Sequence, residues 1–130
     1  MISVDTNVLV RLVAADDPAQ SARAQTVFAD EHVFVAKTVL LETEWVLRSR
    51  YASDPARIHD AFTRLLGLPN VAVEERDAVL QALAHYAEGM DFADALHVVS
   101  SAGAAEFVTF DARLTKRAAG LRTHPGVRRL

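Results

Sequence analysis

A short strand and a helix meet at an acid in the stretch ISVDTNVLVR, residues 2–11. Residues 2–4 are a strand candidate, and residues 6–15 carry apolar side chains at helical spacing. The acid between the two segments is Asp5. Ligands of open α/β sheets bind beyond the carboxyl ends of the strands. The stretch therefore predicts either that Asp5 lies at a ligand-binding edge or that it caps the helix that follows it.

The same alternation of short apolar segments and helices continues along the chain. Further strands are expected at 32–36, 71–73, 107–110 and 127–129, and helices at 18–30, 38–51, 55–66, 74–88, 91–102 and from 111 onward. The helix at 38–51, capped by Thr38, is expected to be buried on most sides because apolar residues nearly surround it. Strands that alternate with helices predict an α/β fold with a short, mostly parallel sheet of four or five strands.

Length and composition predict one globular domain over residues 1–130. The chain has 130 residues, of which 51% are hydrophobic and 24% are charged, and a domain usually contains about 100–200 residues. The absence of cysteine excludes disulfide frameworks, thiolate zinc sites and cysteine nucleophiles. No apolar run reaches the roughly 18 residues that span a bilayer, and the first residues lack the basic segment of a signal peptide. We therefore expect a cytoplasmic protein that has no membrane partner.

The net charge of −3 excludes a uniformly basic nucleic-acid-binding domain, but the charge is unevenly distributed. Residues 110–130 contain six basic residues and one acid, and the chain has twelve arginines against two lysines. Arginine offers a planar fork that suits phosphate groups. The basic segment is either a solubilising tail or a phosphate-binding rim beside an acidic pocket. Candidates for phosphate contacts, in this segment and elsewhere, are Arg48, Arg50, Arg113, Lys116 and Arg117.

Several common catalytic motifs are missing from the sequence. The glycines stand singly, so the chain has no glycine-rich dinucleotide-binding or phosphate-binding loop and no Gly-x-Ser-x-Gly elbow. The five histidines lack metal-ligand spacing, and His97 is interpreted as a packed or capping residue. The acids are therefore the candidate functional residues.

Three acids besides Asp5 occupy positions that an α/β fold would bring together. Asp111 follows the strand at 107–110, and Asp91 and Asp94 begin the preceding helix three residues apart. Asp91 and Asp111 would also be good helix caps, so each is interpreted either as a site residue or as a cap. Asp94 is harder to explain as a cap because its neighbours are apolar.

The apolar helix at 38–51 contains two glutamates with different surroundings. Glu44 has Arg48 four residues later, so we expect a solvated ion pair on the helix surface. Glu42 has apolar residues at these spacings and is therefore the site candidate. Carboxylates that converge repel one another unless a hard cation such as Mg²⁺ lies among them. Such an ion can activate a water molecule and neutralise charge on a cleaved phosphodiester.

These acids lie in four motifs whose order and spacing resemble the PIN-domain ribonucleases, and most closely the VapC toxins of bacterial toxin–antitoxin pairs. The motifs are VDTNVLVR at 4–11, VLLETEWVL at 39–47, DFADALH at 91–97 and TFD at 109–111. The resemblance covers essentially the whole chain. It implies a three-layer α/β/α sandwich around a parallel sheet of about five strands. It also implies an endoribonuclease that hydrolyses phosphodiester bonds of RNA, often tRNA.

The resemblance further implies roles for single residues. The catalytic acids that would hold Mg²⁺ or Mn²⁺ are Asp5, Glu42, Asp94 and Asp111. The residues in supporting positions are Thr6 and Asn7 beside the first acid, Asp91 at a commonly acidic position, and Thr109 in the pocket lining. The basic residues named above then become candidates for contacts with the RNA backbone.

The resemblance also implies partners. Its members usually form homodimers, and a small VapB-like antitoxin silences them in a hetero-oligomer. A PIN-like module that binds RNA or protein without catalysis is the alternative function. A signalling receiver would need an acidic pair after the first strand, and a haloacid-type phosphatase would need an aspartate where Asn7 stands.

Overall fold

Five strands and seven helices alternate in the computed structural model, which describes residues 1–130. Every pair of neighbouring strands is parallel, so the α/β fold expected from the sequence is confirmed. Internal contacts divide the chain into two units, residues 1–76 and 77–130, and each unit has its own parallel sheet. No helix combines the length and the apolar character that crossing a membrane requires.

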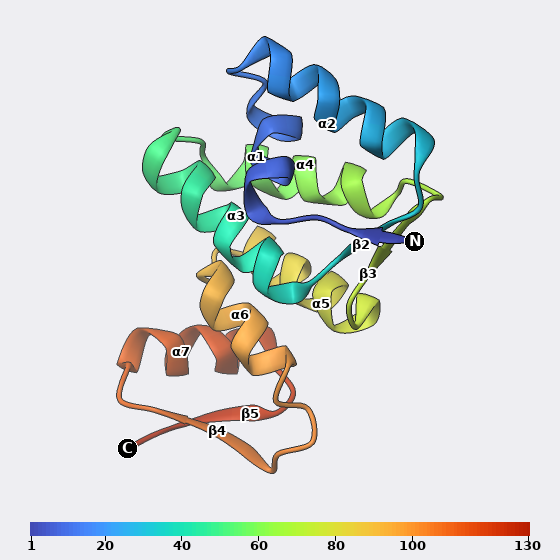
Figure 1. The fold of residues 1–130 in the computed structure, drawn as a ribbon. Coiled ribbons are helices and arrows are strands. Elements are labelled where there is room, and N and C mark those ends of the chain that lie inside the picture. The colour runs from blue at the N-terminus through green and yellow to red at the C-terminus, as the bar shows by residue number, and fades with distance from the viewer. The chain divides into compact units, whose positions relative to one another are not determined.

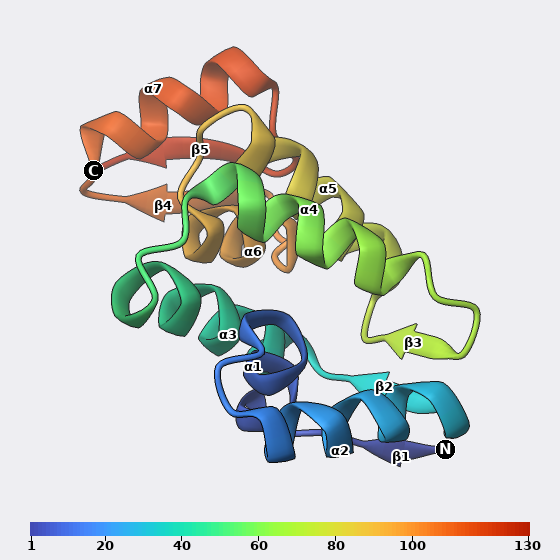
Figure 2. The same cartoon turned by 90° about the horizontal axis from the view of Figure 1, so that it is seen from above.

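The first unit contains a three-stranded sheet in the order β1-β2-β3 (Figures 1 and 2). Its strands are β1 (Ile2–Ser3), β2 (Val33–Val35) and β3 (Val71–Val73). Its helices are α1 (Thr6–Ala14), α2 (Pro18–Asp30), α3 (Lys37–Arg50) and α4 (Pro55–Leu66). Helix α1 lies beside α2 and also packs against α3. Leu9, Leu40 and Phe62 are fully buried in this unit.

Aspartates begin three helices of the first unit. Asp5, Asp17 and Asp54 each accept a hydrogen bond from the backbone N–H three residues later. Such a cap stabilises a helix by about 1 kcal/mol because it satisfies a backbone donor that has no partner within the helix. A proline follows the cap in α2 and in α4, where its fixed φ suits the first turn. These helices therefore begin where the sequence predicts.

Helix α3 differs from its prediction in two respects. It begins at Lys37, and the residue at its N-cap position is Ala36, which forms no side-chain cap, so the expected capping by Thr38 is wrong. Its buried side chains lie at positions 40, 43, 44 and 47, which share one face of a helix. Trp45 on the other side is 50% exposed. The helix is thus buried along one face and not on most sides, and Val39, Leu41 and Val46 on its other sides are only partly covered.

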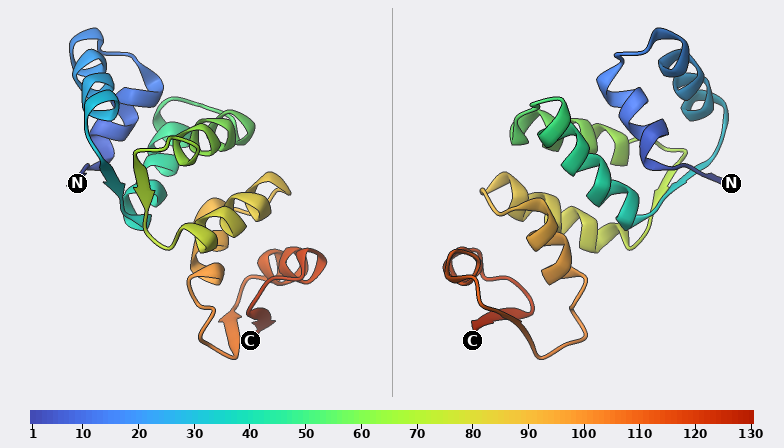
Figure 3. Two further views of the ribbon diagram at one scale, coloured as in Figure 1. Left: turned by 90° about the vertical axis from the view of Figure 1, so that its right-hand side faces the viewer. Right: turned by 60° about the vertical axis from the view of Figure 1, so that its left-hand side comes forward.

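The second unit contains two parallel strands and three helices. In Figure 3 this part of the chain runs from yellow through orange to red. The strands are β4 (Glu106–Thr109) and β5 (Gly126–Arg129). The helices are α5 (Arg76–Ala87), which begins at the last residue of the first unit, α6 (Phe92–Val99) and α7 (Ala112–Leu121). Helix α7 packs against both strands. Helix α6 ends three residues earlier than expected because the chain turns there, with the Ser101 N–H bonded to the Val98 carbonyl.

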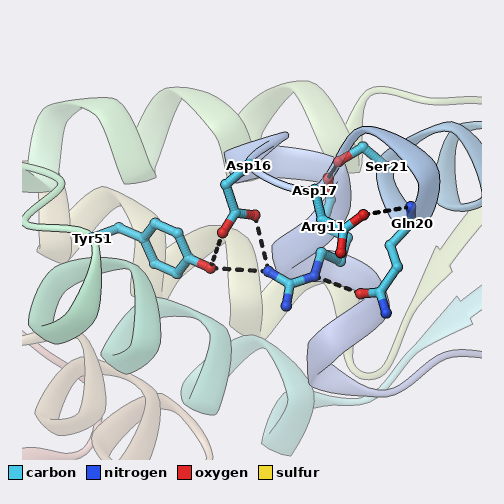
Figure 4. A network of polar contacts seen from close by, with 6 residues as sticks. All are labelled: Arg11, Asp16, Asp17, Gln20, Ser21 and Tyr51. Atoms are coloured by element: carbon cyan, nitrogen blue, oxygen red, sulfur yellow. Dashed lines mark hydrogen bonds and ion pairs between the residues drawn. The ribbon is translucent and has the colours of Figure 1, made fainter.

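A polar network joins α1, the start of α2 and the end of α3 (Figure 4). The guanidinium of Arg11 donates to Asp16 at 2.9 Å, to the Tyr51 hydroxyl at 3.0 Å and to Gln20 Oε1 at 2.7 Å. The Tyr51 hydroxyl in turn donates to the second oxygen of Asp16 at 2.8 Å. This hydrogen bond and the charge of Arg11 lower the pKa of Asp16 below the usual range of an aspartate. The network therefore stabilises the ionised form of Asp16 and fixes the position of Arg11.

We predict that Asp16→Asn lowers the melting temperature by a few degrees near pH 7 and by much less near pH 3. The pKa of Asp16 is lower in the folded chain, so its stabilising effect is present above the pKa of an unfolded aspartate, about 3.9, and is lost as the pH falls through the folded value. Thermal denaturation at both pH values measures this. Asp60→Asn is the matched control, because Asp60 pairs with Arg64 on an exposed helix surface. Equal effects of the two substitutions at pH 7 would contradict the prediction.

Candidate active site

The first candidate acid, Asp5, combines the two interpretations that the sequence left open. It follows β1 in an extended conformation, and its Oδ1 accepts the Val8 N–H at 3.1 Å. The side chain is exposed, and Oδ2 forms no hydrogen bond within the structure. The cap therefore fixes the carboxylate by one oxygen and leaves the other available to a ligand.

A hydrogen bond from Thr6 brings Glu42 next to this acid. The Thr6 hydroxyl donates to Glu42 Oε1 across 36 positions of sequence. Glu42 projects from α3 and is exposed. Thr6 directly follows Asp5, so the structure brings Asp5 and Glu42 together in the first unit. Thr6 therefore holds the second acid by a hydrogen bond, whereas the family resemblance implied that it supports the first.

Glu44, the other glutamate of α3, is not solvated as expected. Its ion pair with Arg48 is present at 2.9 Å, but Glu44 is only 1% exposed. The reason is that position 44 shares the buried face of the helix with positions 40, 43 and 47. The side chain of Arg48 is 43% exposed and is held by this buried carboxylate. Glu44 therefore anchors Arg48 from inside the unit, and Glu42 remains the glutamate that is open to a ligand.

Two acids of the second unit also cap helices. Asp91 Oδ1 accepts the Asp94 N–H at 3.0 Å at the start of α6. Asp111 Oδ1 accepts the N–H groups of Arg113 and Leu114 at the start of α7. The Thr109 hydroxyl accepts the Asp111 N–H at 3.0 Å. Thr109 therefore positions the backbone of Asp111 and is not among the residues that line the pocket described next.

A pocket of about 350 Å³ in the second unit brings acids and arginines together. Asp91, Asp94 and Asp111 line it together with Arg113 and Arg117. The pocket agrees with one of the two interpretations of the basic C-terminal segment, a phosphate-binding rim beside an acidic pocket, and not with a solubilising tail alone. Lys116 lines an adjacent hollow that also includes Arg113 and Arg117.

Gly89 allows Arg117 to approach this pocket closely. The backbone of Gly89 has a φ of +97°, and a Cβ there would lie 2.6 Å from Arg117 Nη1. The same nitrogen donates to the carbonyl of Glu88 at 3.1 Å. A side chain at position 89 would therefore displace the guanidinium from the pocket rim.

The electrostatic state of Asp94 distinguishes it from the other acids. Partial burial raises the pKa of Asp94, and the negative charges of Asp91 and Asp111 raise it further. The positive charge of His97 opposes these effects. His97 is exposed on α6, so of its two interpretations, a packed or a capping residue, the packed alternative is wrong. Charge on Asp94 is therefore costly in this pocket unless a cation lies nearby.

The donor set fits a hard divalent cation by its chemistry. The candidate ligands are all carboxylates, and oxygen ligands suit Mg²⁺ and Mn²⁺. No group of three or more histidine, aspartate or glutamate side chains is arranged within the distances that ligands of one metal ion require. Each unit thus provides suitable oxygen donors without a completed set of ligands.

Three other polar residues of the first unit border Asp5 and were not predicted as site residues from the sequence. Arg11, Gln20 and Arg23 line a second pocket with Asp5, between α1 and α2. Asn7 lines it too and forms no hydrogen bond that supports Asp5, although such support was expected. Finding these residues requires the packing of α1 against α2, which local spacing does not reveal.

We predict that Asp94→Asn raises the melting temperature of the metal-free protein near pH 7. The pKa of Asp94 is raised in the folded chain, so the ionised side chain destabilises the folded state relative to the neutral one. The folded state has its full stability below the pKa of an unfolded aspartate and loses stability as the pH rises through the folded value. The difference between the variant and the unsubstituted protein should therefore disappear near pH 3. Thermal denaturation in EDTA at both pH values measures it. Asp77→Asn, at an exposed position of the same unit, should give no increase; an increase equal to that of Asp94→Asn would contradict the argument.

Comparison with known proteins places these residues in a family. The family model of the PIN domain matches residues 2–120. The solved structures that resemble the chain include VapC20 of Mycobacterium tuberculosis, described as a toxin that cleaves the sarcin-ricin loop. The two chains are 26% identical with a TM-score of 0.46, and the likeness covers 92% of this chain and 95% of that one. No curated protein matches. Because the family model spans most of the chain, including all the candidate acids, the protein belongs to the PIN-domain family.

Proposed function

We propose that this protein is a metal-dependent endoribonuclease that acts as the toxin of a toxin–antitoxin pair. The observation that carries the proposal is the set of acids at the four PIN motifs, Asp5, Glu42, Asp94 and Asp111. Hydrogen bonds hold three of them by one carboxylate oxygen, and none of these three is buried. A purely structural role would not require these three acids to be both fixed and open to a ligand.

The proposed cofactor is Mg²⁺ or Mn²⁺, and the same four acids are its proposed ligands. When bound, such an ion supplies an activated water molecule and neutralises charge on the phosphodiester. The protein's part is to hold the carboxylates ready for it. The caps at Asp5 and Asp111 restrict their rotation, Thr6 holds Glu42, and Thr109 holds the backbone of Asp111.

The basic residues beside the second-unit pocket are the proposed contacts of the RNA backbone. Arg113 and Arg117 line that pocket, and Lys116 lies in the hollow next to it. Arg50 lies 6.0 Å over the ring of Trp45 on an exposed part of α3, so this pair could take a phosphate and a base together. Arg48 is the weakest of the five candidates, because its guanidinium already binds Glu44.

The proposed organisation follows from the family match and the motif resemblance. The match at 2–120 extends over both units, so we propose that they form one PIN domain. A homodimer and a complex with a VapB-like antitoxin are the proposed assemblies. Light scattering on the purified protein tests the first, and mass spectrometry of any peptide that co-purifies tests the second.

We predict that the purified protein cuts total cellular RNA at discrete positions in Mg²⁺ or Mn²⁺ and not in EDTA. Asp5→Asn and Asp94→Asn should each reduce cleavage by more than about 100-fold, because loss of a ligand removes several kcal/mol of transition-state stabilisation. Asp60→Asn is the matched control on an exposed helix surface and should cleave normally. A denaturing gel shows the products directly.

Two results of this assay would contradict the proposed function. Cleavage that persists in EDTA or in Asp94→Asn would exclude the metal-dependent site. An absence of cleavage in preparations that mass spectrometry shows to be free of co-purified peptide would favour the binding module without catalysis.

We also predict that Mn²⁺ raises the melting temperature of the unsubstituted protein. A ligand that binds only the folded state stabilises it in proportion to the logarithm of its concentration. The increase should be small or absent in Asp94→Asn and unchanged in Asp60→Asn. Thermal denaturation across a series of Mn²⁺ concentrations measures it. An equal increase in all three proteins would mean that the ion binds elsewhere.

A further inference from the structure

The pocket between α1 and α2 contains side-chain N–H donors that have no acceptor within the structure. It measures about 350 Å³, a size at the lower end of small-ligand sites. Its polar lining consists of Asp5, Asn7, Arg11, Gln20 and Arg23. All of these residues belong to α1, α2 or the residue that begins α1, so the pocket lies within one unit.

Two of these donors are held in place by the network of Figure 4. Gln20 Oε1 accepts from Arg11 Nε at 2.7 Å, so the amide nitrogen of Gln20 points away from Arg11 with its donors unused. Arg11 is fixed by Asp16 and Tyr51 and keeps one terminal nitrogen without a bond. Little side-chain entropy therefore remains to be lost at these two positions when a ligand binds.

The other two donors have no partner in the structure. Arg23 is exposed on α2 and forms no ion pair, and the amide of Asn7 forms no hydrogen bond. Asp16 balances the charge of Arg11, whereas no acid balances Arg23. The only acid in the lining is Asp5, and one of its oxygens caps α1. The pocket therefore presents a guanidinium and several N–H donors to a ligand that must supply acceptor oxygens.

We propose that this pocket binds a backbone phosphate of the RNA strand, adjacent to the phosphodiester that reaches Asp5. The inference rests on the proposed ribonuclease function and adds a substrate subsite to it. Phosphates repeat along a strand, so an RNA that reaches the acid in this pocket brings further phosphates to the donors beside it. Arg23 is the phosphate anchor, and Arg11, Gln20 and Asn7 add hydrogen bonds. Val8 and Val27 give the pocket an apolar side against which a ribose can lie.

The test measures binding of a labelled single-stranded RNA pool of about 20 nucleotides by fluorescence anisotropy in EDTA, which prevents cleavage. Arg23→Gln should weaken binding by about 3- to 10-fold. It should also reduce the slope of log affinity against log salt by about 0.7, the value for one phosphate contact on a single strand. Arg23→Lys should recover part of the loss, because it restores the charge without the planar fork. Arg23 is exposed and unpaired, so the variants should melt like the unsubstituted protein.

Arg57→Gln is the matched control for the change in net charge. Arg57 is an exposed arginine of α4 in the same unit and lies outside the pocket. It should change affinity by less than twofold and leave the salt slope unchanged. In steady-state cleavage with Mg²⁺, Arg23→Gln should raise KM and leave kcat near its original value, because the contact binds substrate and does not touch the reacting atoms.

The outcomes separate this inference from the proposed function. Equal effects of Arg23→Gln and Arg57→Gln, in a protein that still cleaves RNA with Mg²⁺, would overturn the subsite alone. A protein that neither binds nor cleaves RNA would overturn the proposed function and the subsite with it. If polyglutamate of matched charge competes as well as RNA, and this competition depends on Arg23, the pocket takes an acidic peptide and the assignment to RNA is wrong.

Discussion

Hydrogen bonds between aspartate side chains and helix N-termini are the interactions on which the site of this protein depends. Asp5, Asp91 and Asp111 each use one carboxylate oxygen to satisfy a backbone N–H at the first turn of a helix. The bond restricts the side chain, and the second oxygen forms no hydrogen bond within the structure. One oxygen of each residue can therefore stabilise the helix while the other binds a ligand. A role as a helix cap does not exclude a role in the site.

Electrostatics then determines what those oxygens can bind. In the second unit, Asp94 shares a pocket with two other acids, and its raised pKa records the cost of charge there. Arg113 and Arg117 also line this pocket. Neither arginine forms an ion pair with its acids, and Arg117 donates to a backbone carbonyl instead. A divalent cation would relieve the repulsion among the acids, and the arginines would remain free for a phosphate group. The arrangement suits a substrate that brings negative charge to a metal ion.

Features set by local sequence could be predicted, and those set by packing could not. The strand–helix alternation and the caps at Asp5, Asp91 and Asp111 follow from residues a few positions apart. The burial of Glu44 depends on which face of α3 meets the rest of its unit, and spacing to Arg48 gives no information about that. The bond from Thr6 to Glu42 and the pocket between α1 and α2 require segments distant in sequence to meet. Arg23 of that pocket lies outside the four motifs, and Arg11, although it ends the first motif, is not predicted as a pocket residue.

The central claim, that the acids of the PIN motifs bind a divalent ion, is tested most directly by metal-directed cleavage of the protein chain. Fe²⁺ is bound in place of Mg²⁺, ascorbate and hydrogen peroxide are added, and the cut positions are mapped by mass spectrometry. The account predicts cuts near Asp5, Glu42, Asp94 and Asp111, all suppressed by excess Mg²⁺. Cuts that lie away from all four acids, or that excess Mg²⁺ does not suppress, would contradict it.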